Sequence, residues 1–411
     1  MRDLTSWLEA SPNLDPARFP YEQILAATHQ VGKAHLGDEL LVLLDKARGA
    51  LPPPGNPPEP ARLLLDRFLA CLLDRWDGQF DAPSYLALPL LPTPDPDQLD
   101  LGAAWRAHDW LLVHLLADLL HFETTAAQTT GVPLPRLRPP AQLVAKRCRL
   151  AIRAATPALT RLRLDRPDPD DDLPDAVHTL WTTIAAAVPD GQVDAVRLAM
   201  LPVSTVHDEW LFIRVLQCFE ASFALMVVEL MAANTILSRG NARLAAIFLD
   251  GTASVLREAR PLFSLVATMQ PQAFAAFRVD TDGASAIQSR AAKMIEALCR
   301  RPDPHRLDSA AYRSVPQVRQ RVLDGQFGFE DIYLQMAGRF DAGQRRRVEQ
   351  AMAELADAVG HWRTTHYRLA VRLLGEQPGA GNTTGPSYLA DVRGIPLFHT
   401  VTPAADPIDP A

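Results

Sequence analysis

Leucine, isoleucine and phenylalanine recur at three- and four-residue spacing along most of the chain, with polar residues between them. That period is typical of amphipathic α-helices. Almost no stretch alternates β-branched with polar residues, so we expect few strands. The pattern predicts an all-α fold, with long helices over residues 21–50, 61–76, 103–126, 207–237, 242–269, 284–299 and 344–374.

Proline separates these helices. The 35 prolines gather mainly at 52–60, 92–96, 133–140 and 167–174, and proline breaks helix interiors because it lacks the amide donor. The acidic segment 165–172 has no hydrophobic anchor, which is typical of a solvated connector. We therefore expect an N-terminal helical domain over 1–165, a second helical domain over 175–400 and a frayed tail.

The composition argues against several classes of protein. The chain has 411 residues and a net charge of −7, so it lacks the basic excess that nucleic-acid binding requires. Its four cysteines lie far apart, which argues against a zinc ribbon or a disulfide framework and fits a reducing cytoplasm. No apolar signal segment opens the chain. The longest apolar stretch, 211–233, carries Arg214, Glu220 and Glu229, so we expect a buried helix and no membrane span.

A stripe of large apolar residues follows a His-Asp-Glu segment at 207–209. Phe212, Leu216, Phe219 and Phe223 are spaced by four, three and four residues, which places them on one helical face. The acidic residues before them suit the first turn of a helix. Such a face either packs in the core or forms a wall against a flat aromatic ligand.

Arg278 follows two aromatic residues, Phe274 and Phe277. Apolar neighbours keep a guanidinium partly desolvated, and a guanidinium binds a carboxylate through two parallel hydrogen bonds. The alternative is a surface arginine whose aliphatic stem lies on apolar neighbours.

His366 lies near the end of the helix expected over 344–374, and a loop rich in glycine and threonine follows at 379–389. Glycine lets the backbone approach a ligand closely. The loop lacks the GK[ST] ending of a P-loop, and it follows a helix, so it is not a Rossmann turn. A single helical histidine is either a structural residue or a ligand, and both readings stay open here.

Together and in this order, the three segments resemble the tryptophan 2,3-dioxygenase / indoleamine 2,3-dioxygenase superfamily of histidine-ligated heme proteins. That family carries an HDE-x-LFI segment, an M-x-x-x-x-F-x-x-FR motif with downstream serines, and a proximal histidine before a GTGGSSG-x-x-YL loop. The matching residues of the second and third elements are Met269, Phe274, Phe277, Arg278, Ser285, Gln288, Ser289, His366, Gly375 and the loop at 379–389. The resemblance covers roughly residues 203–389.

The resemblance implies a role for each matched residue. His366 would be the proximal ligand of heme b iron, and Arg278 would bind the α-carboxylate of an amino-acid substrate. Phe212 would line the distal side beside Leu216, against both cofactor and substrate ring. The loop would close over heme propionate and substrate ammonium. The remaining implied positions are Gly379 and Gly381 for the cofactor, and Ser285, Ala380 and Thr383 for the substrate.

The chain departs from the family where substrate selectivity is set. Leu216 stands at the position of the distal histidine of strictly tryptophan-selective dioxygenases, and leucine can neither accept the indole proton nor hydrogen-bond dioxygen. Ala380 replaces the threonine that contacts the substrate ammonium, and Asn382 replaces a glycine of the loop. The family's Y-x-x-Y-L element is not found upstream of His207.

The resemblance implies a heme-dependent oxygenase that inserts dioxygen at the indole C2–C3 bond of L-tryptophan or a modified tryptophan. Leu216 and Ala380 favour an alternative, a heme-dependent rearrangement or hydroxylation of an aromatic amino acid in secondary metabolism. A heme-binding protein without turnover is the third reading. We expect a cytoplasmic monomer or homodimer. No separate metal site is expected, because His108, His114 and His121 on one predicted helix are better explained as buried or interface residues.

Overall fold

The structure is a computed structural model that describes residues 2–10, 14–51, 53, 55, 59–94, 100–129, 131, 133–167, 173–188, 190–284, 286–375 and 385–401. These residues form helices joined by turns, and none of them lies in a β-strand. An isolated backbone bridge pairs Arg136 with Val206. The predicted all-α fold is confirmed.

The helices up to residue 198 are α1 (Arg2–Glu9), α2 (Tyr21–Val31), α3 (Asp38–Ala50), α4 (Pro60–Leu72), α5 (Ala82–Tyr85), α6 (Leu101–Gln128), α7 (Ala141–Leu162), α8 (Leu173–Ala187) and α9 (Asp190–Leu198). Those that follow are α10 (His207–Ser238), α11 (Ala242–Glu258), α12 (Arg260–Val266), α13 (Pro271–Arg278), α14 (Arg290–Cys299), α15 (Pro304–Leu307), α16 (Ala310–Arg313), α17 (Pro316–Leu323), α18 (Phe329–Met336), α19 (Ala342–Leu374) and α20 (Pro386–Arg393). Short 3-10 turns lie at Pro16–Arg18, Lys33–His35, Leu88–Leu90, Val279–Thr281, Ala286–Gln288 and Ala337–Arg339.

Two of the expected helices are interrupted where the backbone turns. The helix expected over 21–50 is split into α2 and α3 at Gly32, whose φ of +87° is open to glycine and strained for other residues. A Cβ atom at Gly32 would also lie 2.4 Å from the backbone oxygen of Val203. The helix expected over 242–269 is split into α11 and α12, with Pro261 in the first turn of α12. Hydrophobic spacing alone reports neither break.

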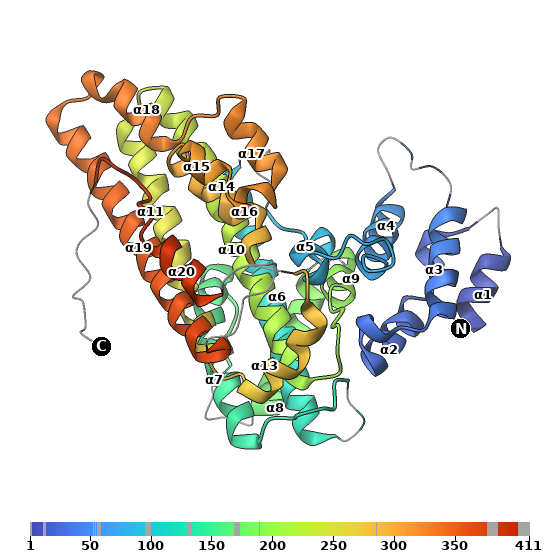
Figure 1. Cartoon of the computed structure of the whole chain (residues 1–411). Helices are drawn as coiled ribbons and strands as arrows, with labels where there is room; N and C mark the ends of the chain where they lie inside the picture. The colour runs from blue at the N-terminus through green and yellow to red at the C-terminus, as the bar shows by residue number, and fades with distance from the viewer. Residues whose placement is uncertain are drawn as a thin grey trace. The chain divides into compact units, whose positions relative to one another are not determined.

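Helices α10 and α19 match their expected ranges closely. A capping box opens α19: the Asp341 carboxylate accepts from the backbone N–H of Gln344 at 2.8 Å, and the Gln344 side chain accepts from that of Asp341 at 3.0 Å. Helix α19 packs along α11, as Figure 1 shows. Helix α10 is long and apolar enough to cross a membrane, but 78% of its most apolar window is buried inside the protein. Burial of that kind is typical of a core helix.

The chain divides into two compact units, each assembled from several segments. The first contains Met1–Pro92, Trp110–Cys218 and Thr268–Ser285, and the second contains Thr93–Asp109, Phe219–Ala267 and Ala286–Ala411. Helices α6 and α10 contribute to both units, α13 belongs to the first and α19 to the second. The predicted domains over 1–165 and 175–400 stay predictions.

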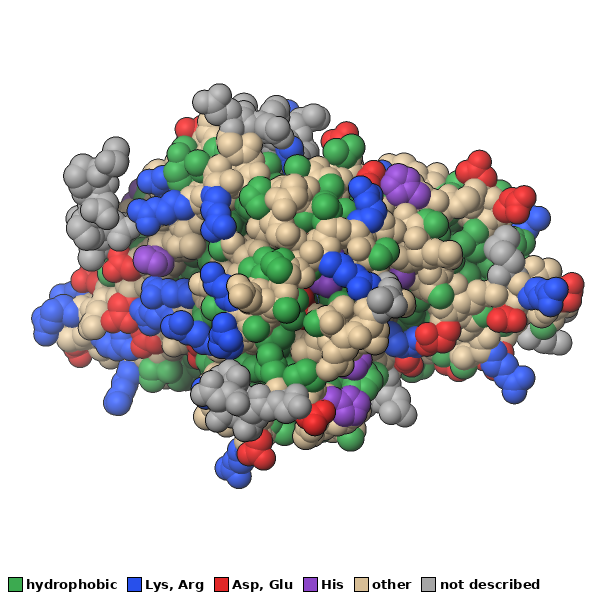
Figure 2. Space-filling model, turned by 90° about the horizontal axis from the view of Figure 1, so that it is seen from below, with side chains coloured by type: hydrophobic (Ala, Val, Ile, Leu, Met, Phe, Trp, Pro, Cys, Tyr) green, Lys and Arg blue, Asp and Glu red, His purple; other side chains and the backbone are tan. Residues whose placement is uncertain are grey.

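Charges of both signs share the surface that Figure 2 shows. Basic, acidic and apolar side chains all appear on this face, and several of the basic ones gather toward the left of the view. The mixture on this face is what the net charge of −7 leads one to expect.

Candidate functional site

The polar residues that open α10 are buried and anchor its first turn. The Glu209 carboxylate accepts hydrogen bonds from the backbone N–H groups of Val203 at 2.7 Å and Ser204 at 2.9 Å. The Tyr85 hydroxyl donates to the same carboxylate at 3.4 Å. Burial raises the pKa of Glu209 to about 7, although these hydrogen bonds act in the opposite direction. The segment therefore fixes the start of α10, less than one turn before Phe212.

The apolar stripe expected along α10 divides into two environments. Phe219 and Phe223 are buried, each 7% exposed, and their rings lie 6.2 Å apart. Phe212 and Leu216 are only half-buried. The core reading of the stripe therefore holds for Phe219 and Phe223, whereas Phe212 and Leu216 keep accessible surface that a ligand could cover.

The accessible positions of α10 follow a strict spacing, which brings in a residue that the sequence analysis did not select. Between residues 207 and 230 the half-buried side chains are those of Phe212, Leu216, Glu220 and Ala224, four residues apart on one helical face. Burial raises the pKa of Glu220 to about 7, opposed by a hydrogen bond from Ser289. Glu220 is thus the titratable side chain of this face, and its position four residues after Leu216 was the signal available in the sequence.

Phe212 lies in an aromatic cluster of the first unit. Its ring centroid is 5.3 Å from that of Phe277, 5.9 Å from that of Phe274 and 6.5 Å from that of Tyr85. Tyr85 comes from α5, and the sequence analysis did not select it. Its contacts with Phe212 and Glu209 place it beside the first turns of α10.

Arg278 ends α13 and is half-buried beside the fully buried Phe277. The turn after it is held by residues from the N-terminal part of the chain. The backbone oxygen of Asp280 accepts from the Arg75 guanidinium, and the Asp280 carboxylate lies 3.3 Å from Nε2 of His35. Within the first unit, the N-terminal helices thus help to place the end of α13.

His366 lies on α19 in the second unit, half-buried among aromatic rings. Its centroid is 5.0 Å from that of Trp362 and 6.4 Å from that of Phe263. Desolvation lowers the pKa of His366 to about 4, so the imidazole is neutral near pH 7. Among the described residues no hydrogen-bond partner of this imidazole is found. A neutral imidazole with an uncommitted nitrogen is the form that ligates a metal.

Aromatic side chains surround His366, and their chemistry bears on heme, the group that the resemblance implies. Phe219, Phe223, Phe263 and Trp362 form a connected set of rings with centroids 4.9–6.2 Å apart. Nε1 of Trp362 is buried and has no hydrogen-bond partner in the described part of the chain. An apolar aromatic setting, a neutral imidazole and a buried donor without a partner among the described residues suit an apolar macrocycle with polar substituents, so these residues fit heme.

The packing of α19 changes along its length. Its residues from Val348 to Ala358 include six fully buried side chains. From 359 to 374 every side chain is at least partly accessible, although Leu, Val and Ala are frequent there. The half that carries His366 is therefore the half that the described chain covers least.

Five predicted site residues lie outside the described residues, namely Ser285, Gly379, Ala380, Gly381 and Thr383. The loop is described at its two ends only. Gly375, with a φ of +59°, follows α19, and Gly385, with a φ of +69°, precedes α20. Both conformations favour glycine.

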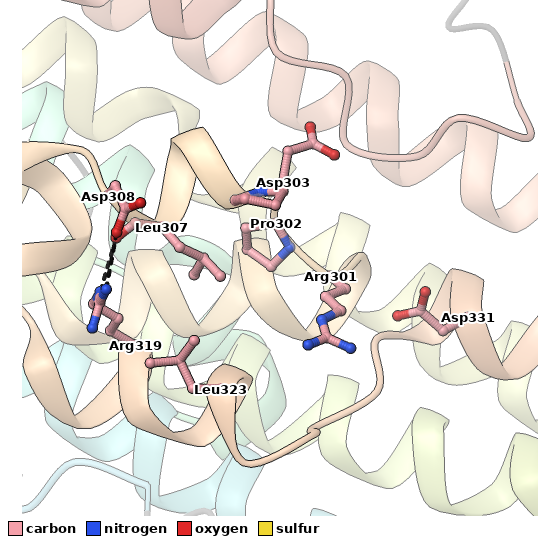
Figure 3. A pocket seen from close by; sticks show the side chains of 9 residues that line it. Arg301, Pro302, Asp303, Leu307, Asp308, Arg319, Leu323 and Asp331 are labelled. Atoms are coloured by element: carbon pink, nitrogen blue, oxygen red, sulfur yellow. Dashed lines mark hydrogen bonds and ion pairs between the residues drawn. The ribbon is translucent and has the colours of Figure 1, made fainter.

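Two other features of the molecule lie apart from the predicted residues. A pocket of about 540 Å³ in the second unit (Figure 3) has a mixed charged lining that includes an Arg319–Asp308 ion pair at 2.9 Å and no predicted site residue.

His108 and His114 on α6 are buried, as expected. The described residues contain no group of three or more His, Cys, Asp or Glu side chains that could hold a metal ion.

Comparison with known proteins points to one family. The chain is 28% identical over 239 residues to the tryptophan 2,3-dioxygenase of Anaeromyxobacter dehalogenans, a match that covers 50% of this chain and 89% of that protein. It is 27% identical over 249 residues to the tryptophan 2,3-dioxygenase of an Anaeromyxobacter species, strain K, with the same coverage. The enzyme of that name from a Polaromonas species is 27% identical over 246 residues, covering 51% of this chain and 83% of the relative. No protein-family model matches the chain. These relatives, the all-α fold and the spaced motifs together support the resemblance of this chain to the tryptophan 2,3-dioxygenase / indoleamine 2,3-dioxygenase superfamily, and to an enzyme of the tryptophan 2,3-dioxygenase type.

Proposed function

We propose that this protein is a heme-dependent oxygenase that inserts dioxygen at the indole C2–C3 bond of L-tryptophan or a modified tryptophan. The relatives carry the name tryptophan 2,3-dioxygenase. The observation that carries the heme assignment is the His366 imidazole, neutral and without a hydrogen-bond partner among the described residues, in an aromatic setting. Bound heme b would supply the iron that binds and activates dioxygen.

The residues of this chain would bind and orient the substrate. Arg278 would hold the α-carboxylate through its two parallel N–H donors. Phe212 would lie against the indole ring, and Leu216 would exclude water beside it. We place Ser285, Ala380 and Thr383 near the substrate and Gly379 and Gly381 near the cofactor, as the family pattern implies. Positioning then carries the catalysis, because neither Phe212 nor Leu216 can donate or accept a proton.

Leu216 supports a second candidate function. A half-buried leucine at the distal position cannot act as a base, so a heme-dependent rearrangement or hydroxylation of an aromatic amino acid is the runner-up. Mass analysis of the product formed under labelled dioxygen separates the two. Dioxygenation adds both oxygen atoms, hydroxylation adds one, and rearrangement adds none.

The first test is the absorption spectrum of the purified protein, supplied with hemin if needed. We expect a Soret band in the wild type and its loss in His366→Ala, because the proximal ligand is removed. His361→Ala is the matched control, since His361 is exposed on the same helix. A wild type that stays colourless with hemin would refute the proposal, and full heme retention in His366→Ala would place the ligand elsewhere.

A titration with L-tryptophan tests whether the heme protein binds an amino-acid substrate or only carries heme. The expected result is a Soret shift that is lost in Arg278→Ala. If no aromatic amino acid shifts the band, the non-catalytic reading gains support instead.

A further inference from the structure

A fully buried arginine, Arg147 of α7, joins several elements of the first unit. Its NH1 atom donates to Oε1 of Glu123 at 2.8 Å and its NH2 atom to Oδ1 of Asp208 at 2.7 Å. Its Nε atom donates to the Thr268 hydroxyl at 3.1 Å, and NH2 also reaches the Thr268 carbonyl at 3.3 Å. All three charged side chains are at most 1% exposed. Four hydrogen bonds from the guanidinium thus reach groups on α6, α10 and the segment before α13.

Asp208 extends this arrangement to α13. Its second carboxylate oxygen, Oδ2, accepts from the backbone N–H of Gln270 at 2.8 Å. Gln270 is the N-cap residue of α13, and its own side chain makes no capping hydrogen bond. A carboxylate from α10 therefore supplies the negative charge that the start of α13 favours.

Helix α13 connects its N-cap, which Asp208 holds, directly to Arg278 at its other end. It is eight residues long, from Pro271 to Arg278, which corresponds to about 12 Å. Phe274 and Phe277 on the same helix contact Phe212. Because Asp208 opens α10 and also caps α13, one buried carboxylate sets the starts of the helices that carry Phe212 and Arg278.

We propose that the Arg147–Asp208 pair is a positioning unit that fixes the direction of α13 and thereby the placement of Arg278. This inference rests on the proposed carboxylate-binding role of Arg278. It also gives α6 and α7, which lie before the region of family resemblance, a task in the reaction: they bring Glu123 and Arg147 to the start of α10.

Two conservative variants test the proposal in the heme-loaded full chain, Asp208→Asn and Arg147→Lys. Asparagine keeps the shape of aspartate without its charge, and lysine keeps the charge without the fork. Arg214→Lys is the matched control, because Arg214 is a fully buried arginine on α10 whose partners are Asp118, Gln217 and the Val196 carbonyl. Heme content should be unchanged in all three variants.

The binding readout is the Soret titration with L-tryptophan and, in parallel, with tryptamine, which lacks the carboxylate. We expect affinity for L-tryptophan to fall roughly tenfold or more in both test variants. Affinity for tryptamine should stay within about twofold of wild type, and the control should bind both ligands normally. In the Arg278→Ala background, Asp208→Asn should cause no further loss, because the effect passes through Arg278. An equal loss of both ligands, or an equal loss in Arg214→Lys, would overturn the proposal in favour of general destabilisation.

Hydrogen exchange provides a readout that needs no substrate, so failure of the proposed function can be told apart from failure of this inference. Amides of residues 272–278 should exchange faster in both test variants and at the wild-type rate in Arg214→Lys. Unchanged exchange there would refute the positioning role even if L-tryptophan binds. A wild type that binds no aromatic amino acid, with the exchange pattern as expected, would refute the proposed function and leave the control of α13 by Arg147 and Asp208 established.

Discussion

The buried polar groups in the first turn of α10 and in the last turns of α19 differ in their hydrogen-bond partners. At the start of α10, Asp208 and Glu209 are buried and each accepts several hydrogen bonds from the protein. Near the end of α19, the His366 imidazole and the Trp362 N–H lie among aromatic rings without a partner in the described part of the chain. Buried polar groups are normally paired. The two carboxylates of the first region are satisfied inside the first unit, although Nδ1 of the neighbouring His207 has no partner among the described residues. Under the proposed function, heme would complete the second region.

The contrast also separates structural from functional residues within one family pattern. Asp208 and Glu209 act as a structural cap, because their carboxylates accept hydrogen bonds from groups inside the first unit. His366 differs from them, since desolvation lowers its pKa and no described residue forms a hydrogen bond with it. A motif match alone therefore does not separate structural from functional residues. The contacts that each matched residue makes in the structure do separate them.

The largest effect that distinguishes the two regions is expected from Arg147→Met. It leaves the Glu123 and Asp208 carboxylates buried without their cation, which typically costs 3–5 kcal/mol, an order-of-magnitude figure. Urea unfolding of the apoprotein measures the loss. His366→Ala, by contrast, should lower apoprotein stability by about 1 kcal/mol or less, because it breaks no buried hydrogen bond. Similar losses in the two variants would erase the distinction between the regions.

A smaller effect concerns Glu220, whose carboxyl lies on the accessible face of α10. Burial raises its pKa from 4.5 to about 7, so the folded protein holds a proton that the unfolded chain has released. Its stabilising contribution is fully present below about pH 4.5 and is lost as the pH rises through about 7. We expect Glu220→Gln to remove this loss and flatten the stability–pH curve by up to ~1.4 kcal/mol per pH unit across that window.

Urea unfolding at about pH 5 and about pH 7.5 checks the expectation for Glu220. Glu354→Gln is the control, since this glutamate of α19 is 40% exposed and the substitution should leave the curve unchanged. If Glu220→Gln keeps the wild-type slope, the Glu220 carboxyl titrates alike in the folded protein and the unfolded chain, which would contradict its raised pKa.

The helices and the candidate ligands were accessible from the sequence because both depend on local spacing. The ranges of α10 and α19 follow from apolar periodicity, and His366 and Arg278 follow from motif spacing. The breaks at Gly32 and Pro261 depend on backbone dihedrals that a hydrophobic pattern does not record.

The partners of Arg147 could not be predicted, because they are tertiary. They lie 24, 61 and 121 residues away along the chain, and nothing in the sequence near residue 147 marks it as more than a helical arginine. The role of Tyr85 could not be predicted for the same reason, because its contacts with Glu209 and Phe212 join residues far apart in the sequence.

The finest test of the contrast is Trp362→Phe, which keeps an aromatic ring beside His366 and removes only the indole N–H. That buried donor has no partner among the described residues, so its removal should leave the stability of the apoprotein unchanged or raise it slightly, because an unpaired buried donor is itself unfavourable. With heme bound, the N–H would have a partner among the polar substituents of the macrocycle. We then expect hemin affinity to fall about tenfold, or ~1.4 kcal/mol. Trp181→Phe in the first unit is the control and should leave hemin binding unchanged. An apoprotein destabilised by Trp362→Phe with normal hemin affinity would make this tryptophan a structural residue like those at the start of α10.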